Sequence, residues 1–164
     1  MSIEGDLQLL AEQERVLQFS EFGADSAWAL GCILRDAALA RGGAMTIEIE
    51  VAGRRLFACA TDGAPAGQAD WIRRKRNTVM RFGRSSYAMG LMLELEGKTI
   101  EARHGLTLAD FAMHGGGFPI ALKGTGTVGS VVVSGLPQRD DHTMVVEGLA
   151  HLLGVEAPAL DKSS

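Results

Sequence analysis

Two aspartates and a histidine stand side by side near the C-terminus, in the segment SGLPQRDDH at residues 134–142. A carboxylate next to a neutral imidazole can take a proton from a small metabolite, so Asp140 or Asp141 beside His142 is a candidate catalytic group. The same carboxylates suit a helix start, where aspartate accepts hydrogen bonds from free backbone N–H groups. There the helix dipole keeps the histidine neutral. The simpler alternatives are a helix cap and a histidine of the core or surface.

A second candidate site is the glycine-rich run HGGGFP at residues 114–119. HGGG occurs in the oxyanion hole of some lipases and esterases, but that fold also needs a G-x-S-x-G nucleophile motif, which this chain lacks. One glycine is enough to end a helix, so three in succession indicate a backbone that approaches something closely. The run therefore predicts either the wall of a small-ligand pocket or close packing.

Most of the positive charge lies in the segment WIRRKRNTVMRFGR at residues 71–84. At about 100° per residue, its arginines share one broad arc of a helix, opposite an apolar stripe that contains Trp71 and Val79. Arginine pairs with carboxylate or phosphate through a planar fork, so the arc predicts an anion site, a salt-bridged subunit interface, or both. A solvated helix face is the simpler alternative. Lys75 falls inside the apolar stripe, which fits an interface better than a free surface.

Composition narrows the class of protein. The chain has 164 residues with 46% apolar and 22% charged residues, which predicts one domain over residues 1–156 and a flexible tail over residues 157–164. A net charge of −4 and few aromatic residues argue against a nucleic-acid partner. No apolar run is long enough for a membrane span, and the acidic N-terminus does not resemble a signal peptide. We expect a cytoplasmic protein with free thiols at Cys32 and Cys59.

The spacing of the histidines does not indicate a metal-binding site. The four histidines show no paired-ligand spacing, so no metal site is expected, although one neutral imidazole could serve as an axial haem ligand.

The hydrophobic pattern predicts the elements that must position these residues. The glycines of Gly124-x-Gly126-x-x-Gly129 precede a β-branched run and no helix, so they indicate a hairpin turn rather than a phosphate-binding loop. Two hairpins separated by helices predict an α+β fold, a mainly antiparallel sheet with helices packed on it. The expected helices are 3–17, 26–40, 68–82, 85–96, 107–114 and 141–153, and the expected strands are 45–51, 55–60, 118–123 and 128–133.

The C-terminal half resembles the GlcG-like, haem-degrading-domain family in its pattern G-G-x-P, then G-x-x-G-x-x-x-V-S-G, then Asp140. The stretches WIRRKRNTVMRFGRSSY and SGLPQRDDH resemble an uncharacterised branch of that family. The resemblance implies a profilin-like fold and compact homo-oligomers built from dimers. Some relatives bind or break down haem, and others accompany glycolate or small-acid metabolism. By matched positions, it implies a pocket at Gly115, Gly116, Phe118, Pro119, Ser134, Gly135 and Asp140.

The leading hypothesis is a homo-oligomeric protein that binds a small anionic molecule, with haem as a candidate cofactor. The alternatives are an enzyme acting on a small carboxylate or phosphorylated metabolite, and an oligomeric interaction module. The candidate ligand-binding residues are Arg73, Arg76, Arg81, Arg84, His114, Gly115, Gly116, Gly117, Phe118, Pro119, Ser134, Gly135, Arg139, Asp140 and His142.

Overall fold

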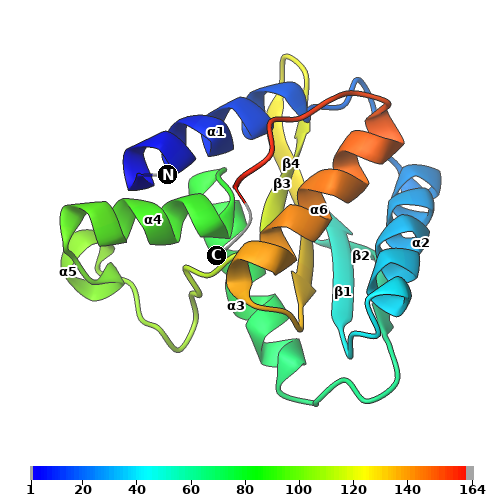
Figure 1. The fold of residues 1–164 in the computed structure, drawn as a ribbon, viewed down its shortest axis with the longest axis horizontal. Helices are drawn as coiled ribbons and strands as arrows, with labels where there is room; N and C mark the ends of the chain where they lie inside the picture. Colours follow the sequence, from blue (N-terminus) through cyan, green and yellow to red (C-terminus); the bar gives the residue numbers. More distant parts are fainter. Residues whose placement is uncertain (1, 162–164) are drawn as a thin grey trace.

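The computed structural model describes residues 2–161, and Figure 1 shows a four-stranded sheet with helices on both faces. The predicted α+β fold with an antiparallel sheet is therefore confirmed. In chain order, the elements are α1 (Ile3–Val16), α2 (Ala24–Ala40), β1 (Thr46–Val51), β2 (Arg54–Ala60), α3 (Gln68–Phe82), α4 (Ser86–Glu96), α5 (Ile100–His104), β3 (Gly117–Leu122), β4 (Gly126–Ser134) and α6 (Gln138–Leu153).

The sheet has the order β2-β1-β4-β3, and all its neighbouring strands run antiparallel. A two-residue turn joins β1 to β2, with positive φ at Ala52 and Gly53 as a tight hairpin turn requires. The β-branched run of β4 occupies the centre, between β1 and β3, where both of its faces are covered. The expected hairpins are thus both present.

Alternation along β1 separates the two faces of the sheet. Ile47 and Ile49 are fully buried in the main core, which α2 and α6 cover. Glu48 faces the other way, where α3 lies, and pairs with Arg76. The glutamates of this strand therefore meet basic side chains of a helix rather than open solvent.

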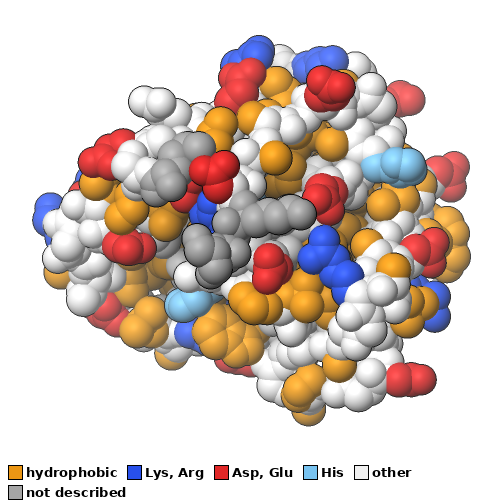
Figure 2. All heavy atoms as spheres, viewed as in Figure 1, with side chains coloured by type: hydrophobic (Ala, Val, Ile, Leu, Met, Phe, Trp, Pro, Cys, Tyr) orange, Lys and Arg blue, Asp and Glu red, His pale blue; other side chains and the backbone are white. Residues whose placement is uncertain are grey.

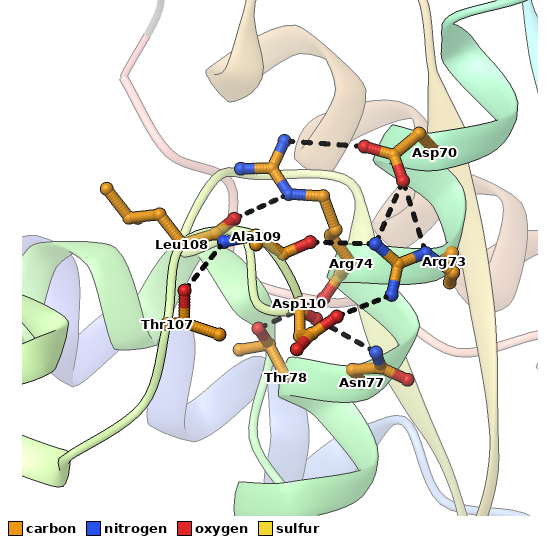
Figure 3. Close-up of polar contacts among 9 residues, drawn as sticks. All are labelled: Asp70, Arg73, Arg74, Asn77, Thr78, Thr107, Leu108, Ala109 and Asp110. Carbon is orange, nitrogen blue, oxygen red and sulfur yellow. Dashed lines mark hydrogen bonds and ion pairs between the residues drawn. The ribbon is translucent and has the colours of Figure 1, made fainter.

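The expected helix over residues 107–114 is wrong. A short helix, α5, lies earlier in the chain and begins at the cap Thr99. Residues 107–116 form a turn and a loop that pack against α3, as Figure 3 shows. Arg74 and Asn77 of α3 donate hydrogen bonds to the carbonyls of Leu108 and Asp110. Because tertiary contacts satisfy these polar backbone groups, the segment needs no helical hydrogen bonds of its own.

The start of the last helix and the segment that follows it also differ from what the sequence pattern predicts. The last helix begins at Gln138 rather than near residue 141, with Pro137 at its N-cap, so neither aspartate is the cap residue. Beyond α6, Leu160 is buried beside Leu10, and Pro158 accepts a hydrogen bond from Gln13. Residues 162–164 of the expected tail lie outside the described residues.

Candidate functional site

Arg73 and Arg76 of α3 point to different acidic partners, all of them within the same chain. Arg73 pairs with Asp70 and Asp110 at 2.9 and 3.0 Å (Figure 3), and Arg76 pairs with Glu48 and Glu50. These pairings neutralise both guanidinium groups within the fold.

Two further arginines of the arc, Arg84 and Arg81, do not join these pairs. Arg84 pairs with Glu14 of α1 at 2.5 Å. Arg81 is exposed, and no ion pair joins it to any residue that the structure describes. The structure therefore does not gather Arg73, Arg76, Arg81 and Arg84 around one recess.

The three glycines at residues 115–117 are required by close packing. A Cβ atom on Gly115 would overlap the carbonyl of Gln138, and one on Gly117 would lie 2.9 Å from Val79 Cγ2. One on Gly116, whose φ is +126°, would lie 2.7 Å from Lys75 Nζ. The backbone thus passes tightly between α3, β4 and the start of α6. Phe118 and Pro119 continue into β3, and both are buried.

A cavity of about 300 Å³ opens beside this crossing, between α3, the end of β4 and the start of α6. Three of the candidate residues, His114, Ser134 and Gly135, lie on its wall. We call it the β4–α6 pocket. Its lining residues are Gln68, Trp71, Lys75, His114, Ser134, Gly135, Leu136, Gln138 and Asp141.

A buried ion pair forms one wall of the β4–α6 pocket. Lys75 is only 3% exposed and Asp141 only 1%, and the Lys75 ammonium lies 3.2 Å from the Asp141 carboxylate. The carboxylate also accepts hydrogen bonds from the backbone N–H groups of Gly135 and Leu136. Burial lowers the pKa of Lys75 and raises the pKa of Asp141, while their mutual attraction opposes both shifts.

The Lys75 ammonium has hydrogen-bonding capacity to spare. Of its three N–H donors, one reaches the Val133 carbonyl at 3.0 Å and one reaches Asp141. The third has no acceptor among residues 2–161, and the side chain lines the pocket. A ligand oxygen can therefore take this donor.

His114 and Trp71 form the aromatic part of the pocket wall, and the Lys75 ammonium lies 6.0 Å from the centre of the Trp71 ring. Their rings meet edge to face with centroids 5.2 Å apart. Partial burial lowers the pKa of His114, and the nearby positive charges of Lys75 and Arg74 lower it further. The imidazole is therefore neutral near neutral pH and can donate or accept a hydrogen bond.

The other predicted residues of the last helix lie away from the pocket. His142 is 1% exposed, its Nε2 lies 2.8 Å from Gln13 Oε1, and its ring contacts Tyr87 and Phe118. Because successive helix residues are about 100° apart, His142 points into the core while Asp141 points to the pocket.

Arg139 and Asp140 lie at a different hollow. Arg139 pairs with Asp6 at 2.8 Å and donates to the Tyr87 hydroxyl at 3.1 Å. Both Arg139 and Asp140 line a surface hollow that also includes Leu160.

The candidate list from the sequence omitted most of the polar pocket residues. Lys75 carried one usable signal, a lysine inside an apolar stripe, which indicates a buried amine that needs a partner. Gln68, Trp71 and Gln138 carried no comparable signal, because only the packing of α3 and α6 against the end of β4 brings them to one pocket.

The comparisons with known proteins identify the family. A family model described as "Haem degrading protein HbpS-like" matches residues 22–150, which is most of the chain. The chain belongs to the HbpS-like family. It is 53% identical over 154 residues to a UPF0303 protein of Burkholderia mallei (strain NCTC 10229), with 94% of this chain and 93% of the relative covered. A UPF0303 protein of Sinorhizobium medicae (strain WSM419) is 49% identical over 164 residues, with 100% of both covered.

Solved structures share the same fold. The Ybr137w protein superposes with a TM-score of 0.84 at 30% identity, covering 90% of this chain and 89% of that one. HbpS superposes with a TM-score of 0.64 at 21% identity, covering 84% and 93%. PduOC, crystallised in a complex with haem, superposes with a TM-score of 0.68 at 12% identity, covering 83% and 97%. The last two likenesses concern the fold alone.

The HbpS-like family description makes haem a group to test against these residues. A neutral imidazole at His114 suits an axial position on iron. However, Arg73, Arg76 and Arg84 are already paired with acids of the chain, and the pocket is at the small end of the range of about 300–1,000 Å³ for ligand sites. Within residues 2–161, no three His, Cys, Asp or Glu side chains cluster to hold a metal ion. The pocket of one chain therefore does not fit an enclosed haem.

Proposed function

We propose that this member of the HbpS-like family binds a small organic carboxylate in the β4–α6 pocket. The observation that carries the proposal is Lys75, a buried ammonium on the pocket wall with one N–H donor left over. A carboxylate oxygen accepts a hydrogen bond from an ammonium more strongly than a neutral oxygen does. A cavity of about 300 Å³ suits a molecule of a few carbon atoms.

The rest of the pocket suits the remainder of such a ligand. Trp71 offers an aromatic surface, and the Gln138 amide nitrogen and the neutral His114 offer hydrogen-bonding groups. The Gln68 amide is already bonded to Thr46 and to the Ala44 carbonyl, so it shapes the wall. This mixture of one aromatic wall and a few converging polar groups is typical of small-molecule sites. Because Asp141 already offsets the charge of Lys75, the pocket should favour an acid with one carboxylate over a highly charged phosphate ester.

The face shown in Figure 2 carries no continuous basic surface. On the face shown in Figure 2, basic side chains lie scattered among acidic ones and form no continuous stripe. Proteins that bind nucleic acid usually contact the phosphate backbone with a continuous stripe of basic side chains. None of the described helices is long and apolar enough to cross a membrane.

A thermal-shift screen with small monocarboxylic acids tests the proposed function. A ligand at 100 times its dissociation constant should raise the free energy of unfolding by about 2.7 kcal/mol, which is a shift of several degrees in Tm. His114→Gln and Gln138→Ala should weaken the shift, because both residues line the pocket. His151→Gln is the matched control, because His151 lies exposed near the other end of α6.

Haemin serves as the competing ligand. Saturable binding of haemin, followed by its Soret band, together with no response to any small acid, would contradict the proposed function in favour of a haem protein. An equal response of the His114→Gln, Gln138→Ala and His151→Gln variants would show that any acid binds outside the pocket.

A homo-oligomer built from dimers and a cytoplasmic location remain part of the proposal. Sizing chromatography with light scattering tests the assembly. Reversing the charges of Arg73 and Arg76 would not isolate an interface, because Arg76 also pairs with Glu48 of its own sheet. Arg81→Glu is the better probe, because this side chain is exposed and has no ion pair with the described residues.

A further inference from the structure

Lys75 differs from the other described lysines in its surroundings. Its side chain is 4% exposed, whereas the side chain of Lys98 is 53% exposed and Lys123 is also exposed. Its amine is placed by two contacts, to the Val133 carbonyl and to Asp141, and it faces a cavity. A buried amine at the wall of a small-molecule pocket is a typical nucleophile for carbonyl compounds.

Asp141 lies where it can accept the proton that the Lys75 ammonium must lose before it acts as a nucleophile. Its Oδ2 lies 3.2 Å from Lys75 Nζ, which is within hydrogen-bond reach. Burial lowers the pKa of the amine and raises that of the carboxyl group, so it brings the two proton affinities closer together. Transfer of one proton from the ammonium to the carboxylate leaves a neutral pair, which a buried site tolerates.

We propose that Lys75 forms a Schiff base with the carbonyl carbon of a small 2-oxo acid bound in the β4–α6 pocket. This inference rests on the proposed function and adds a ligand class and a covalent step to it. The carboxylate of the acid is the group that the pocket binds, and the adjacent carbonyl carbon is the group that the amine attacks.

The step balances without a further reactant. Asp141 takes one proton from the Lys75 ammonium, and the neutral amine attacks the carbonyl carbon to form a C–N bond. A second amine proton moves to the former carbonyl oxygen and gives a hydroxyl group. That hydroxyl receives the proton held by Asp141 and leaves as water, and a protonated imine remains. The Asp141 carboxylate then pairs with this imine as it paired with the ammonium.

Reductive trapping tests the inference on the full-length wild-type chain. The protein is incubated with pyruvate or glyoxylate, treated with sodium cyanoborohydride and analysed by intact mass and peptide mapping. We expect one adduct, with the mass of the acid less one oxygen atom, on Lys75. Labelling of Lys75 should exceed that of Lys98 and Lys123 severalfold, because the pocket holds the acid beside the Lys75 amine, whereas the other two lysines are exposed.

Two variants sharpen the result. Lys75→Arg keeps a positive charge beside Asp141 and should abolish the adduct. Asp141→Asn should slow trapping severalfold, because the proton acceptor is lost. If either variant fails to fold, the peptide map of the wild type still decides which lysine reacts.

The outcomes separate this inference from the proposed function. Labelling of Lys98 and Lys123 to the same extent as Lys75 would overturn the inference. Small acids that shift Tm through the pocket but leave no adduct would also overturn it, while the proposed binding function would stand. The absence of both a Tm shift and an adduct would contradict the proposed function and this inference together.

Discussion

Lys75 and His142 show two ways to bury a titratable side chain. Lys75 keeps a carboxylate beside it, because an ammonium removed from water needs a counter-charge and hydrogen-bond acceptors. His142 has Gln13 as its only hydrogen-bond partner in the described chain and two aromatic rings around it, so it stays neutral. The first arrangement keeps a paired charge at a pocket wall, and the second contributes to the core.

Lowering the pH should destabilise the protein through His142. Burial lowers its pKa from 6.5 to about 3, so between these values the unfolded chain binds a proton that the folded chain does not. Its contribution to stability is therefore complete above the unfolded pKa and falls as the pH drops through this window. From about pH 7 to about pH 5 we expect the free energy of unfolding to fall by about 2 kcal/mol, measured by urea denaturation.

His142→Gln is the test variant, because glutamine can still hydrogen-bond Gln13 but does not titrate. It should lose most of this pH dependence. His114→Gln is the control, since the pKa of His114 is also lowered but its side chain is partly solvated and contributes less. A full wild-type pH dependence in His142→Gln would contradict the assignment.

Gly116→Ala should destabilise the fold strongly. The residue has a φ of +126°, and the added methyl group would meet the Val133 carbonyl and Lys75 Nζ. We expect a loss of more than about 3 kcal/mol in the free energy of unfolding. Gly124→Ala, also at positive φ but with nothing within 4 Å of the new methyl group, should cost only about 1 kcal/mol. Similar losses for the two would mean that the crossing is less tightly packed than described.

Helix α3 is the element that joins the sheet, the pocket and the loop at residues 107–116. Arg76 meets Glu48 of β1, and Lys75 meets Asp141 of α6. A third side of the helix holds the loop through Arg73 and Arg74, as Figure 3 shows. A helix that looks like a solvated cationic face in isolation is therefore packed on most of its circumference.

Arg76→Glu should destabilise the protein far more than Arg81→Glu. The first change places a third carboxylate beside Glu48 and Glu50, of which Glu48 is largely buried, and should cost roughly 2 kcal/mol or more. The second alters an exposed side chain and should stay within about 0.5 kcal/mol. Chemical denaturation of both variants measures the difference. Equal effects would show that the Arg76 pairing adds nothing to stability.

The whole molecule has a main core and smaller satellite clusters. The main core lies between the sheet and the helices α2 and α6. A second cluster joins α1 and α4, and the chain after α6 returns to close it with Leu160 beside Leu10 and Tyr87. The C-terminal segment thus links helices that are distant in the sequence.

Leu160→Ala should therefore destabilise the protein although the residue lies close to the C-terminus. Loss of its packing should cost about 2 kcal/mol, at the low end for leucine because the site is at the edge of a cluster. Val155→Ala, at a position 42% exposed, should change stability by less than about 0.5 kcal/mol. Thermal denaturation distinguishes them, and equal midpoints would indicate a segment that packs only loosely.

Local patterns were sufficient for most of the fold. The alternation of β1, the turn at Ala52 and Gly53, and the β-branched run of β4 predict the two hairpins, because each depends on neighbouring residues alone. The helix expected at residues 107–114 failed for the opposite reason, since α3 takes the hydrogen bonds of that segment.

The candidate site depended on contacts that no local pattern contains. Three candidates, His114, Ser134 and Gly135, do line the β4–α6 pocket, because the ends of neighbouring strands meet. The pairs Arg76–Glu48, Arg84–Glu14 and Lys75–Asp141 join residues dozens of positions apart. By itself the sequence determined the elements, their order and the family resemblance. Only the tertiary structure decided which charges neutralise one another and which one is left facing a cavity, because a charge acts through distance and burial.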